Sequence, residues 1–197
     1  MAYSEKHKYQ WWGQPRTASR TLMGIQDALG FSDMNNHNCK VYNPDWNTVI
    51  SIRNPYGRAI SFWILNHGLE PHNQERISFE EYLKSKNQYY LIKGPMSWNP
   101  IYRLKKLNGK IYTIRNESII EDLLDIPIVG NNLDILKNEI ETIKTNRSTY
   151  RKFYLLEQDK PYYELYTQEL ADIVYEIKKE EFETWGYGKD SWKTLII

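Results

Sequence analysis

A short segment near the start of the sequence, residues 11–22, concentrates side chains that bind anions. It carries two arginines and three hydroxyl groups: Arg16, Thr17, Ser19, Arg20 and Thr21. A loop that leads into a helix N-terminus also offers unpaired backbone N–H groups and the positive end of the helix dipole. The chemistry expected of this segment is therefore the binding of an anion, most simply a phosphate or a sulfate.

A second pair of anion-binding side chains follows at Arg53 and Ser61. Arg53 stands at the end of an apolar, β-branched run over residues 48–52, and Ser61 lies eight residues later. A guanidinium group offers a forked pair of donors and serine a hydroxyl, so the two can hold one tetrahedral anion from two sides. In isolation, an ion pair between Arg53 and a surface carboxylate would be the simpler interpretation.

Two strand–loop–helix units position these side chains. Strands are expected over residues 7–12 and 48–53, and the helices that follow them over residues 21–30 and 58–68. This repetition is typical of βαβ units with a parallel sheet, in which ligands bind beyond the carboxyl ends of the strands. Both loops are thus expected at the same edge of one sheet.

The rest of the sequence continues the alternation of strands and helices. Helices are expected over residues 78–86, 99–107, 119–124, 133–143 and 163–182, and strands over residues 39–42 and 110–115. No internal repeat, low-complexity tract or linker interrupts the sequence. We therefore predict a single α/β domain over residues 1–197, with three layers and a mainly parallel sheet flanked by helices.

Composition excludes several classes of function. The 197 residues carry a formal net charge of +1, so no global field recruits nucleic acid or an acidic membrane. The one cysteine, Cys39, excludes an intrachain disulfide. No apolar run is long enough to span a membrane, and no signal peptide is recognisable at the N-terminus. A cytoplasmic location is expected.

Both anion-binding segments resemble motifs of the sulfotransferase family. Pro15-Arg16-Thr17-Ala18-Ser19 matches the 5′-phosphosulfate loop, which commonly reads Pro-Lys/Arg-Thr/Ser-Gly/Ala-Ser/Thr. Residues 50–62 resemble the 3′-phosphate motif, a strand that ends in Arg-Asp/Asn-Pro with a serine eight positions after the arginine. The resemblance extends through residues 111–123 and 146–187 and so touches most of the chain. A Walker A loop fits poorly, because Ala18, Ser19 and Arg20 stand where Gly, Lys and Ser/Thr are required.

The resemblance implies a P-loop-like nucleotide-binding fold and the donor 3′-phosphoadenosine 5′-phosphosulfate (PAPS). It implies that the 5′-phosphosulfate is held by backbone N–H groups together with Pro15, Arg16, Thr17, Ala18, Ser19, Arg20 and Thr21. Arg53 and Ser61 would hold the 3′-phosphate. The sulfuryl group would pass, without a metal, to a hydroxyl or amine of an acceptor that family analogy makes a saccharide. Many members carry lysine where this chain has Arg16, which keeps its charge but cannot give up a proton at neutral pH.

An acceptor hydroxyl needs a general base, and His37 is the first candidate. It follows the first helix and precedes the second motif, where related enzymes often carry a histidine. Glu117 and Asp45 are weaker candidates. Aromatic side chains at Trp63, Trp98 and Tyr102 fit a wall that stacks on sugar rings and fit core packing equally well.

Two other functions stay open. The first is an ATP- and magnesium-dependent kinase-like enzyme, against which stand the missing Walker lysine and the lack of a strand-end aspartate suited to Mg²⁺. The second is a non-catalytic nucleotide-binding module of the same fold, for which Arg16 in place of lysine leaves room.

Overall fold

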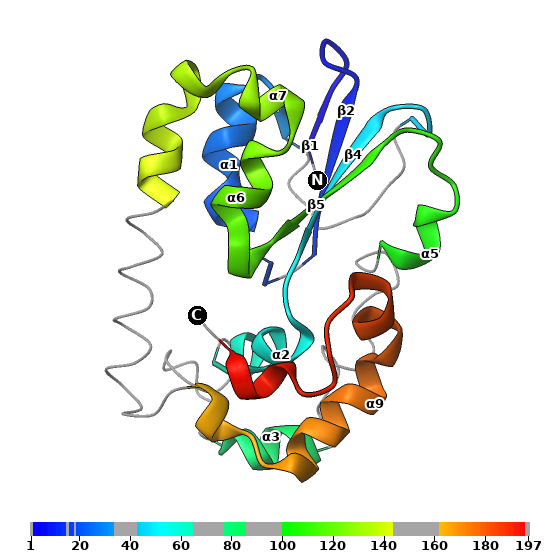
Figure 1. The fold of residues 1–197 in the computed structure, drawn as a ribbon, viewed down its shortest axis with the longest axis vertical. Helices are drawn as coiled ribbons and strands as arrows, with labels where there is room; N and C mark the ends of the chain where they lie inside the picture. Colours follow the sequence, from blue (N-terminus) through cyan, green and yellow to red (C-terminus); the bar gives the residue numbers. More distant parts are fainter. Residues whose placement is uncertain are drawn as a thin grey trace. The chain divides into compact units, whose positions relative to one another are not determined.

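A computed structural model describes most of the chain. The described residues are 2–14, 16–17, 19–33, 43–64, 77–85, 100–143 and 162–195, with backbone alone described for residues 19–21, 33 and 162. The chain forms two compact units, drawn in Figure 1. Unit 1 comprises Met1–Ile52 and Ser97–Glu157, and unit 2 comprises Arg53–Met96 and Gln158–Ile197. Because the segments of the two units alternate along the chain, no linker in the sequence marks the division.

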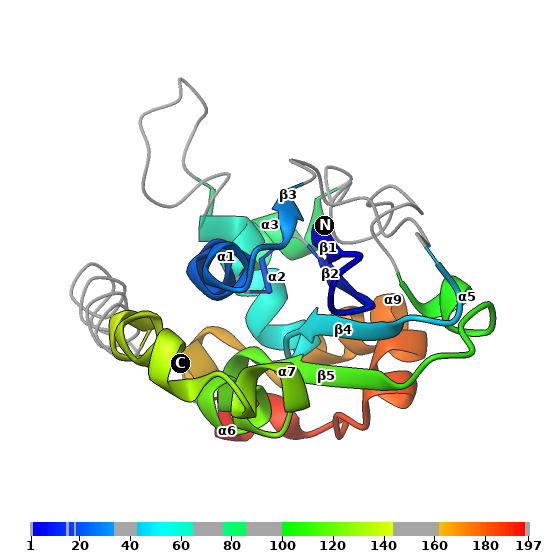
Figure 2. The ribbon, with the colours of Figure 1, turned by 90° about the horizontal axis from the view of Figure 1, so that it is seen from above.

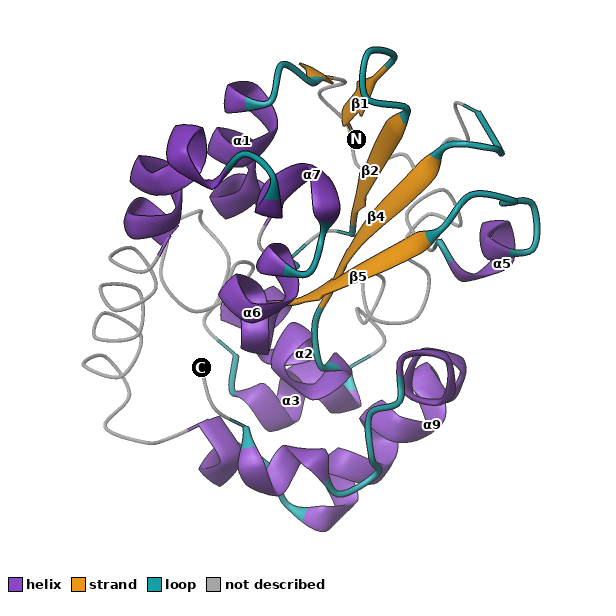
Figure 3. Cartoon of the chain, turned by 45° about the horizontal axis from the view of Figure 1, so that its top comes forward, coloured by secondary structure: helices purple, strands orange, loops and turns teal. Residues whose placement is uncertain are grey.

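Unit 1 contains a mixed five-stranded sheet with the strand order β3-β1-β2-β4-β5 (Figures 2 and 3). The strands are β1 (Ala2–Ser4), β2 (Tyr9–Gly13), β3 (Ser32–Asp33), β4 (Asn47–Ile52) and β5 (Ile111–Arg115). Strands β2, β4 and β5 are parallel, whereas β1 runs antiparallel to both β2 and β3. The prediction of a mainly parallel sheet therefore holds for β2, β4 and β5 and is wrong for the antiparallel pairs β1–β2 and β1–β3. Residues 5–8 form a tight turn, which is too short for a parallel crossover and folds β1 back onto β2.

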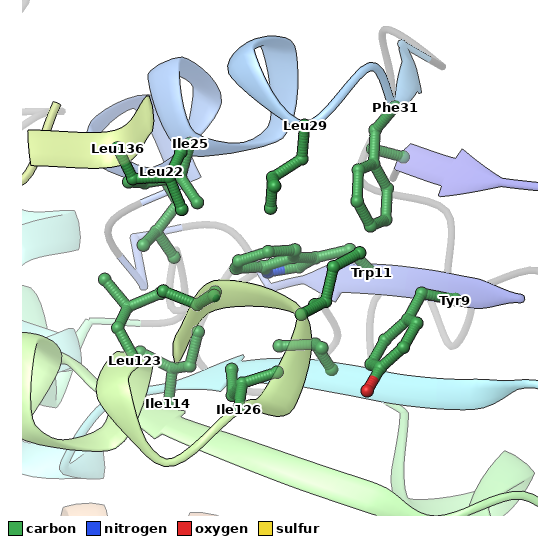
Figure 4. Close-up of a cluster of buried hydrophobic side chains, with 14 of the residues drawn as sticks. Tyr9, Trp11, Leu22, Ile25, Leu29, Phe31, Ile114, Leu123, Ile126 and Leu136 are labelled. Carbon is green, nitrogen blue, oxygen red and sulfur yellow. The ribbon is translucent and has the colours of Figure 1, made fainter. Parts of the chain in front are cut away.

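Helices of unit 1 pack against one face of this sheet. They are α1 (Ser19–Ala28), α6 (Ile119–Leu124), α7 (Pro127–Gly130) and a helix over residues 133–143, while α5 (Ile101–Leu104) and the 3₁₀ turn η3 (Asn116–Ser118) flank β5. Figure 4 shows the core that results, with the fully buried Trp11 ring among side chains from α1, α6 and the sheet. The Trp11 indole N–H donates to Ser51 Oγ at 3.3 Å, which ties β2 to β4 across the core face. Trp12 and Ile50 alternate to the opposite face and are also fully buried.

Unit 2 is helical. It contains α2 (Pro55–Trp63), α3 (Phe79–Lys84), η4 (Tyr162–Leu165), α9 (Gln168–Trp185) and η5 (Ser191–Thr194). Helices α2, α3 and α9 pack together (Figure 1). Aromatic rings fill their interface: Tyr166 lies 5.2 Å from Tyr56 and 5.1 Å from Phe79, between ring centroids, in edge-on geometry. Such pairs contribute roughly 0.5–1.5 kcal/mol each beyond the area they bury.

Most predicted elements are confirmed with shifted ends. Helix α2 begins three residues earlier than predicted, because the Asn54 side chain caps it by accepting from the Tyr56 N–H at 3.0 Å and Pro55 suits its first position. Helix α9 begins at Gln168, five residues later than predicted, because the Thr167 hydroxyl accepts from the Leu170 N–H at 3.3 Å. It ends at Trp185, before Gly186 with its positive φ of 73°.

Three predictions differ further from the structure. Helix α5 spans only Ile101–Leu104 of the helix predicted over residues 99–107. The short strands β1 and β3 were not predicted at all. The strand predicted over residues 39–42 lies outside the described residues. Among the helices that the structure describes, none combines the length and apolar character needed to cross a membrane.

Candidate functional site

The two motif segments leave the sheet at the same edge. Strands β2 and β4 are parallel neighbours in which Trp12 pairs with Ile50 and Gly13 with Ser51. The first loop begins immediately after Gly13, and Arg53 follows Ile52 directly in the chain. The expectation that both segments start from the same edge of one sheet is therefore confirmed, and the structure adds that the two strands are neighbours. In open α/β sheets this edge is where ligands bind.

The first loop is a tight turn built around Gln14, Arg16 and Thr17. Gln14 and Thr17 are buried, and the Thr17 hydroxyl donates to the Gln14 carbonyl at 2.6 Å while its N–H lies 3.3 Å from the same oxygen. Arg16 is half-buried and adopts a left-handed φ of 67°, which is uncommon outside glycine. Because the Thr17 proton is given to Gln14, Thr17 shapes the turn in this structure instead of offering its proton to an anion.

Helix α1 begins at Ser19, two residues before its predicted start. Its first backbone N–H groups, which lack partners within the helix, therefore belong to the segment that resembles the 5′-phosphosulfate loop. Ten residues of helix give this end a positive dipole. Pro15 and Ala18 lie outside the described residues, as do the side chains of Ser19, Arg20 and Thr21.

In unit 2, the Arg53 guanidinium lies close against the first turn of α2. A Cβ added at Gly57 would stand 3.2 Å from Arg53 Nε and 3.8 Å from Arg53 Nη2. The missing side chain of Gly57 is thus what allows the guanidinium to approach the helix backbone. Ser61 lies four residues after Gly57, one helical turn onward on the same face, and is buried. Arg53, Gly57 and Ser61 therefore follow one face of α2.

Two tyrosine hydroxyl groups form hydrogen bonds near the start of α2. The Tyr166 hydroxyl donates to the Tyr56 carbonyl at 2.9 Å, and the Tyr56 hydroxyl donates to the Lys189 carbonyl at 2.6 Å. Burial raises the pKa of both tyrosines, and the positive charge of Arg53 opposes part of this rise for the pKa of Tyr166. Both phenols therefore stay protonated and uncharged at neutral pH.

The three candidates for the general base differ in their position relative to the carboxyl edge of the sheet. His37 lies outside the described residues. Glu117 is half-buried in η3, directly after β5, at the carboxyl edge of the parallel strands. Asp45 precedes β4 and accepts a hydrogen bond from Asn108 Nδ2 at 2.8 Å. Five residue steps along β4 place Asp45 about 17 Å or more from the carboxyl edge, so the interpretation of Asp45 as a base is wrong.

The aromatic residues considered for a sugar-stacking wall differ in their exposure to solvent. Trp63 is 7% exposed, its indole N–H donates to the Ile77 carbonyl at 2.9 Å, and its ring packs edge-on against Phe79. Trp63 is therefore a core residue. Tyr102 is exposed on α5, where Arg103 lies over its ring at 5.1 Å. Trp98 lies outside the described residues.

Sequence reasoning missed Gly57 as part of the candidate site. A signal was present, because glycine in a helix interior costs roughly 0.5–1 kcal/mol relative to alanine and so marks a position where something approaches closely. It also missed the pairing of Arg58 with Glu181, which are 123 residues apart in the chain. No local sequence pattern indicates that two charged residues so far apart in the chain will form an ion pair.

Comparison with known proteins adds no relative: no protein-family model, no curated protein and no solved structure matches this chain.

Proposed function

We propose that the chain is a sulfotransferase that moves a sulfuryl group from PAPS to a hydroxyl or amine of an acceptor, with saccharides as the acceptor class. The fold we propose for it is the three-layer, P-loop-like nucleotide-binding type. The observation that carries the proposal is the parallel pairing of β2 with β4, which starts both anion-binding segments from one sheet edge. Two phosphate-binding segments in this order are what a donor with phosphate groups at both its 5′ and 3′ positions requires.

Each segment has a stated role in donor binding. The N-terminus of α1 and the loop before it would hold the 5′-phosphosulfate through backbone N–H groups, Arg16 and the hydroxyl and guanidinium side chains of residues 19–21. Arg53, seated against Gly57, would supply a forked pair of donors to the 3′-phosphate, and Ser61 a hydroxyl. The structure gives Thr17 the role of closing the loop.

The proposed reaction is an in-line displacement at sulfur. The acceptor oxygen or nitrogen forms a bond to sulfur while the bond from sulfur to the bridging phosphate oxygen breaks, and adenosine 3′,5′-bisphosphate leaves. The acceptor proton passes to a general base, for which we propose His37, with Glu117 as the second candidate. Arg16 carries a fixed charge, so it would stabilise the charge that develops on the bridging and sulfuryl oxygens without donating a proton.

Donor binding is tested by thermal unfolding with adenosine 3′,5′-bisphosphate and with 5′-ADP, each in EDTA and in magnesium. A ligand at about 100 times its Kd stabilises by roughly 2.7 kcal/mol. For a chain of this size the Tm should rise by about 5–10 °C. We expect this rise with the 3′,5′-bisphosphate alone, independent of metal. A larger, magnesium-dependent rise with 5′-ADP would instead favour the kinase-like enzyme.

Catalysis is tested by transfer of radiolabelled sulfate from PAPS to a panel of oligosaccharides. Arg16→Ala and His37→Ala are each expected to reduce turnover by about 100-fold or more, the usual scale for a charge-stabilising or proton-accepting group. Lys106→Ala, at an exposed position shortly after α5, is the control and should leave turnover unchanged. Metal-independent binding of the bisphosphate without any transfer would favour a non-catalytic binding module.

A further inference from the structure

A buried cluster of three charged side chains joins α2 to α9 within unit 2. Arg58 Nη1 donates to Glu181 Oε2 at 2.6 Å, and Arg58 Nη2 donates to Glu181 Oε1 at 3.1 Å. Lys178 Nζ lies 3.1 Å from the same Oε1 atom. The side chains of Arg58, Glu181 and Lys178 are only 10%, 6% and 13% exposed. Two cations therefore share one carboxylate in the interior of the unit.

Stability alone does not account for this cluster. Removing charges from water costs several kcal/mol each, so a buried ion pair is often no more stabilising than apolar side chains of similar volume. Burial by itself would raise the pKa of Glu181, but the charges of Arg58 and Lys178 hold that pKa below its usual range. Burial lowers the pKa of Lys178, and the charge of Glu181 opposes this effect. What the forked Arg58–Glu181 contact supplies beyond attraction is a fixed orientation.

That orientation bears directly on the face of α2 that carries the proposed 3′-phosphate site. Arg58 follows Gly57 and precedes Ser61 by three residues, and successive residues of an α-helix are rotated by about 100° around its axis. Fixing the direction of Arg58 therefore fixes the directions of Gly57 and Ser61. A small rotation of α2 would change the space available to the guanidinium, because Arg53 Nε lies only 3.2 Å from the position that a Cβ on Gly57 would occupy.

Helix α9 holds Glu181 in place for this contact. The helical backbone of α9 is interrupted at Lys178, where φ is −115° and ψ is 15°, and Lys178 is the residue whose ammonium group reaches Glu181 three positions onward. The start of α2 is anchored separately, by Asn54 Nδ2 to Ser191 Oγ at 3.0 Å and by the Tyr56 hydroxyl. The forked contact of Arg58 adds, in the middle of α2, a restraint on rotation of the helix about its axis.

We propose that Arg58, Glu181 and Lys178 are positioning residues that set the rotation of α2, so that Gly57 and Ser61 face the Arg53 guanidinium. The inference rests on the proposed donor site, because it concerns recognition of the 3′-phosphate. None of the three touches the donor in this arrangement, and their effect on binding passes through α2.

The test compares the affinities for adenosine 3′,5′-bisphosphate and for 5′-AMP, which lacks the 3′-phosphate, by titration calorimetry on the full chain. Charge-assisted hydrogen bonds to a 3′-phosphate should make the ratio of the two Kd values about 10 to 100 in the unaltered protein. Arg58→Lys keeps the charge but cannot form the fork, and Glu181→Gln keeps the shape but removes the carboxylate charge. Each is expected to bring the ratio to within about threefold of unity, with the affinity for 5′-AMP preserved.

The matched control is Val174→Ala, a fully buried position on α9 that carries no charge. It should lower the Tm and leave the ratio unchanged, whereas Lys178→Met, which leaves the fork intact, should reduce the ratio less than Arg58→Lys does. Amide hydrogen exchange over residues 56–61 should be faster in Arg58→Lys than in Val174→Ala at matched stability. A normal ratio in both charge variants overturns this inference alone. A ratio near unity in the unaltered protein overturns the proposed donor site, and this inference with it.

Discussion

Substitution of Gly57 by alanine should change stability and donor affinity in opposite directions. Gly57 lies inside α2 and does not have a positive φ, so alanine can adopt its backbone conformation without strain. Alanine is favoured over glycine in a helix interior by roughly 0.5–1 kcal/mol. The Tm of Gly57→Ala is therefore expected to stay constant or to rise by up to about 2–4 °C.

The same methyl group should weaken binding of the 3′-phosphate. It would stand 3.2 Å from Arg53 Nε, so the guanidinium would have to move by a few tenths of an ångström, whereas its 3.6 Å separation from Leu195 Cδ2 is an ordinary contact. Losing one well-aligned, charge-assisted hydrogen bond costs about 1.5–3 kcal/mol. A shift that spoils the alignment without removing the arginine should cost the lower part of that range, which is about a tenfold loss of affinity.

Calorimetric titration and thermal unfolding of the same preparations measure both effects. The Kd for adenosine 3′,5′-bisphosphate should rise about tenfold in Gly57→Ala while the Kd for 5′-AMP stays constant. Gly24→Ala is the matched control: it is also a glycine inside a helix, α1, and its Cβ would meet Glu139 Cγ at 3.4 Å. It should gain stability without losing affinity for either nucleotide. The reasoning fails if Gly57→Ala binds the bisphosphate like the unaltered protein, or if both nucleotides lose affinity equally.

Two further predictions concern unit 1. In Gly109→Ala the new Cβ would clash with the Trp46 carbonyl oxygen, a backbone atom that cannot easily move. We expect the free energy of unfolding to fall by about 3 kcal/mol or more and the Tm by about 6–12 °C. The control Gly188→Ala, which has open space around the new Cβ, should unfold at the same temperature as the unaltered protein. Burial, reinforced by the neighbouring Tyr112, raises the pKa of Tyr9 to about 12, above the value of about 10 in an unfolded chain. Its contribution to the free energy of unfolding should therefore be complete below pH 10 and lost as the pH rises towards 12; urea unfolding should show a shallower decline over this range for Tyr9→Phe, and equal declines would contradict the prediction.

Local sequence signals placed the elements that carry the candidate site. The β-branched run at residues 48–52 lies in β4, and the strand expected over residues 7–12 corresponds to β2, with the parallel direction that the repeated strand–loop–helix pattern predicts. The helix predicted from residue 78 begins with a capping box, in which Ser78 Oγ accepts from the Glu81 N–H at 3.1 Å. The long helix ends before Gly186, a residue type that favours the left-handed conformation found there. These features depend on residues within a few positions of one another, which is why they can be read from the sequence.

Helix starts were predicted less well, because side-chain caps decide them. Asn54 and Thr167 each accept a hydrogen bond from a backbone N–H two or three residues onward, and these contacts moved the starts of α2 and α9 by several positions. The spacing of apolar residues shows which face of a helix is buried, but not which backbone N–H groups are satisfied by a cap. It therefore placed the start of α2 too late and the start of α9 too early.

The sequence by itself thus determined the order of the strands and helices of the candidate site, the parallel direction of β2 and β4, and the edge from which both anion-binding segments start. Only the tertiary structure decided that β1 makes the sheet mixed, that Asp45 lies at the opposite edge, and that Trp63 is a core residue. Only the tertiary structure, too, set Arg53 against Gly57 and joined Arg58 to Glu181. The physical reason is distance along the chain: periodicity, turns and caps act between near neighbours, whereas strand partners, burial and ion pairs are fixed when remote segments pack together.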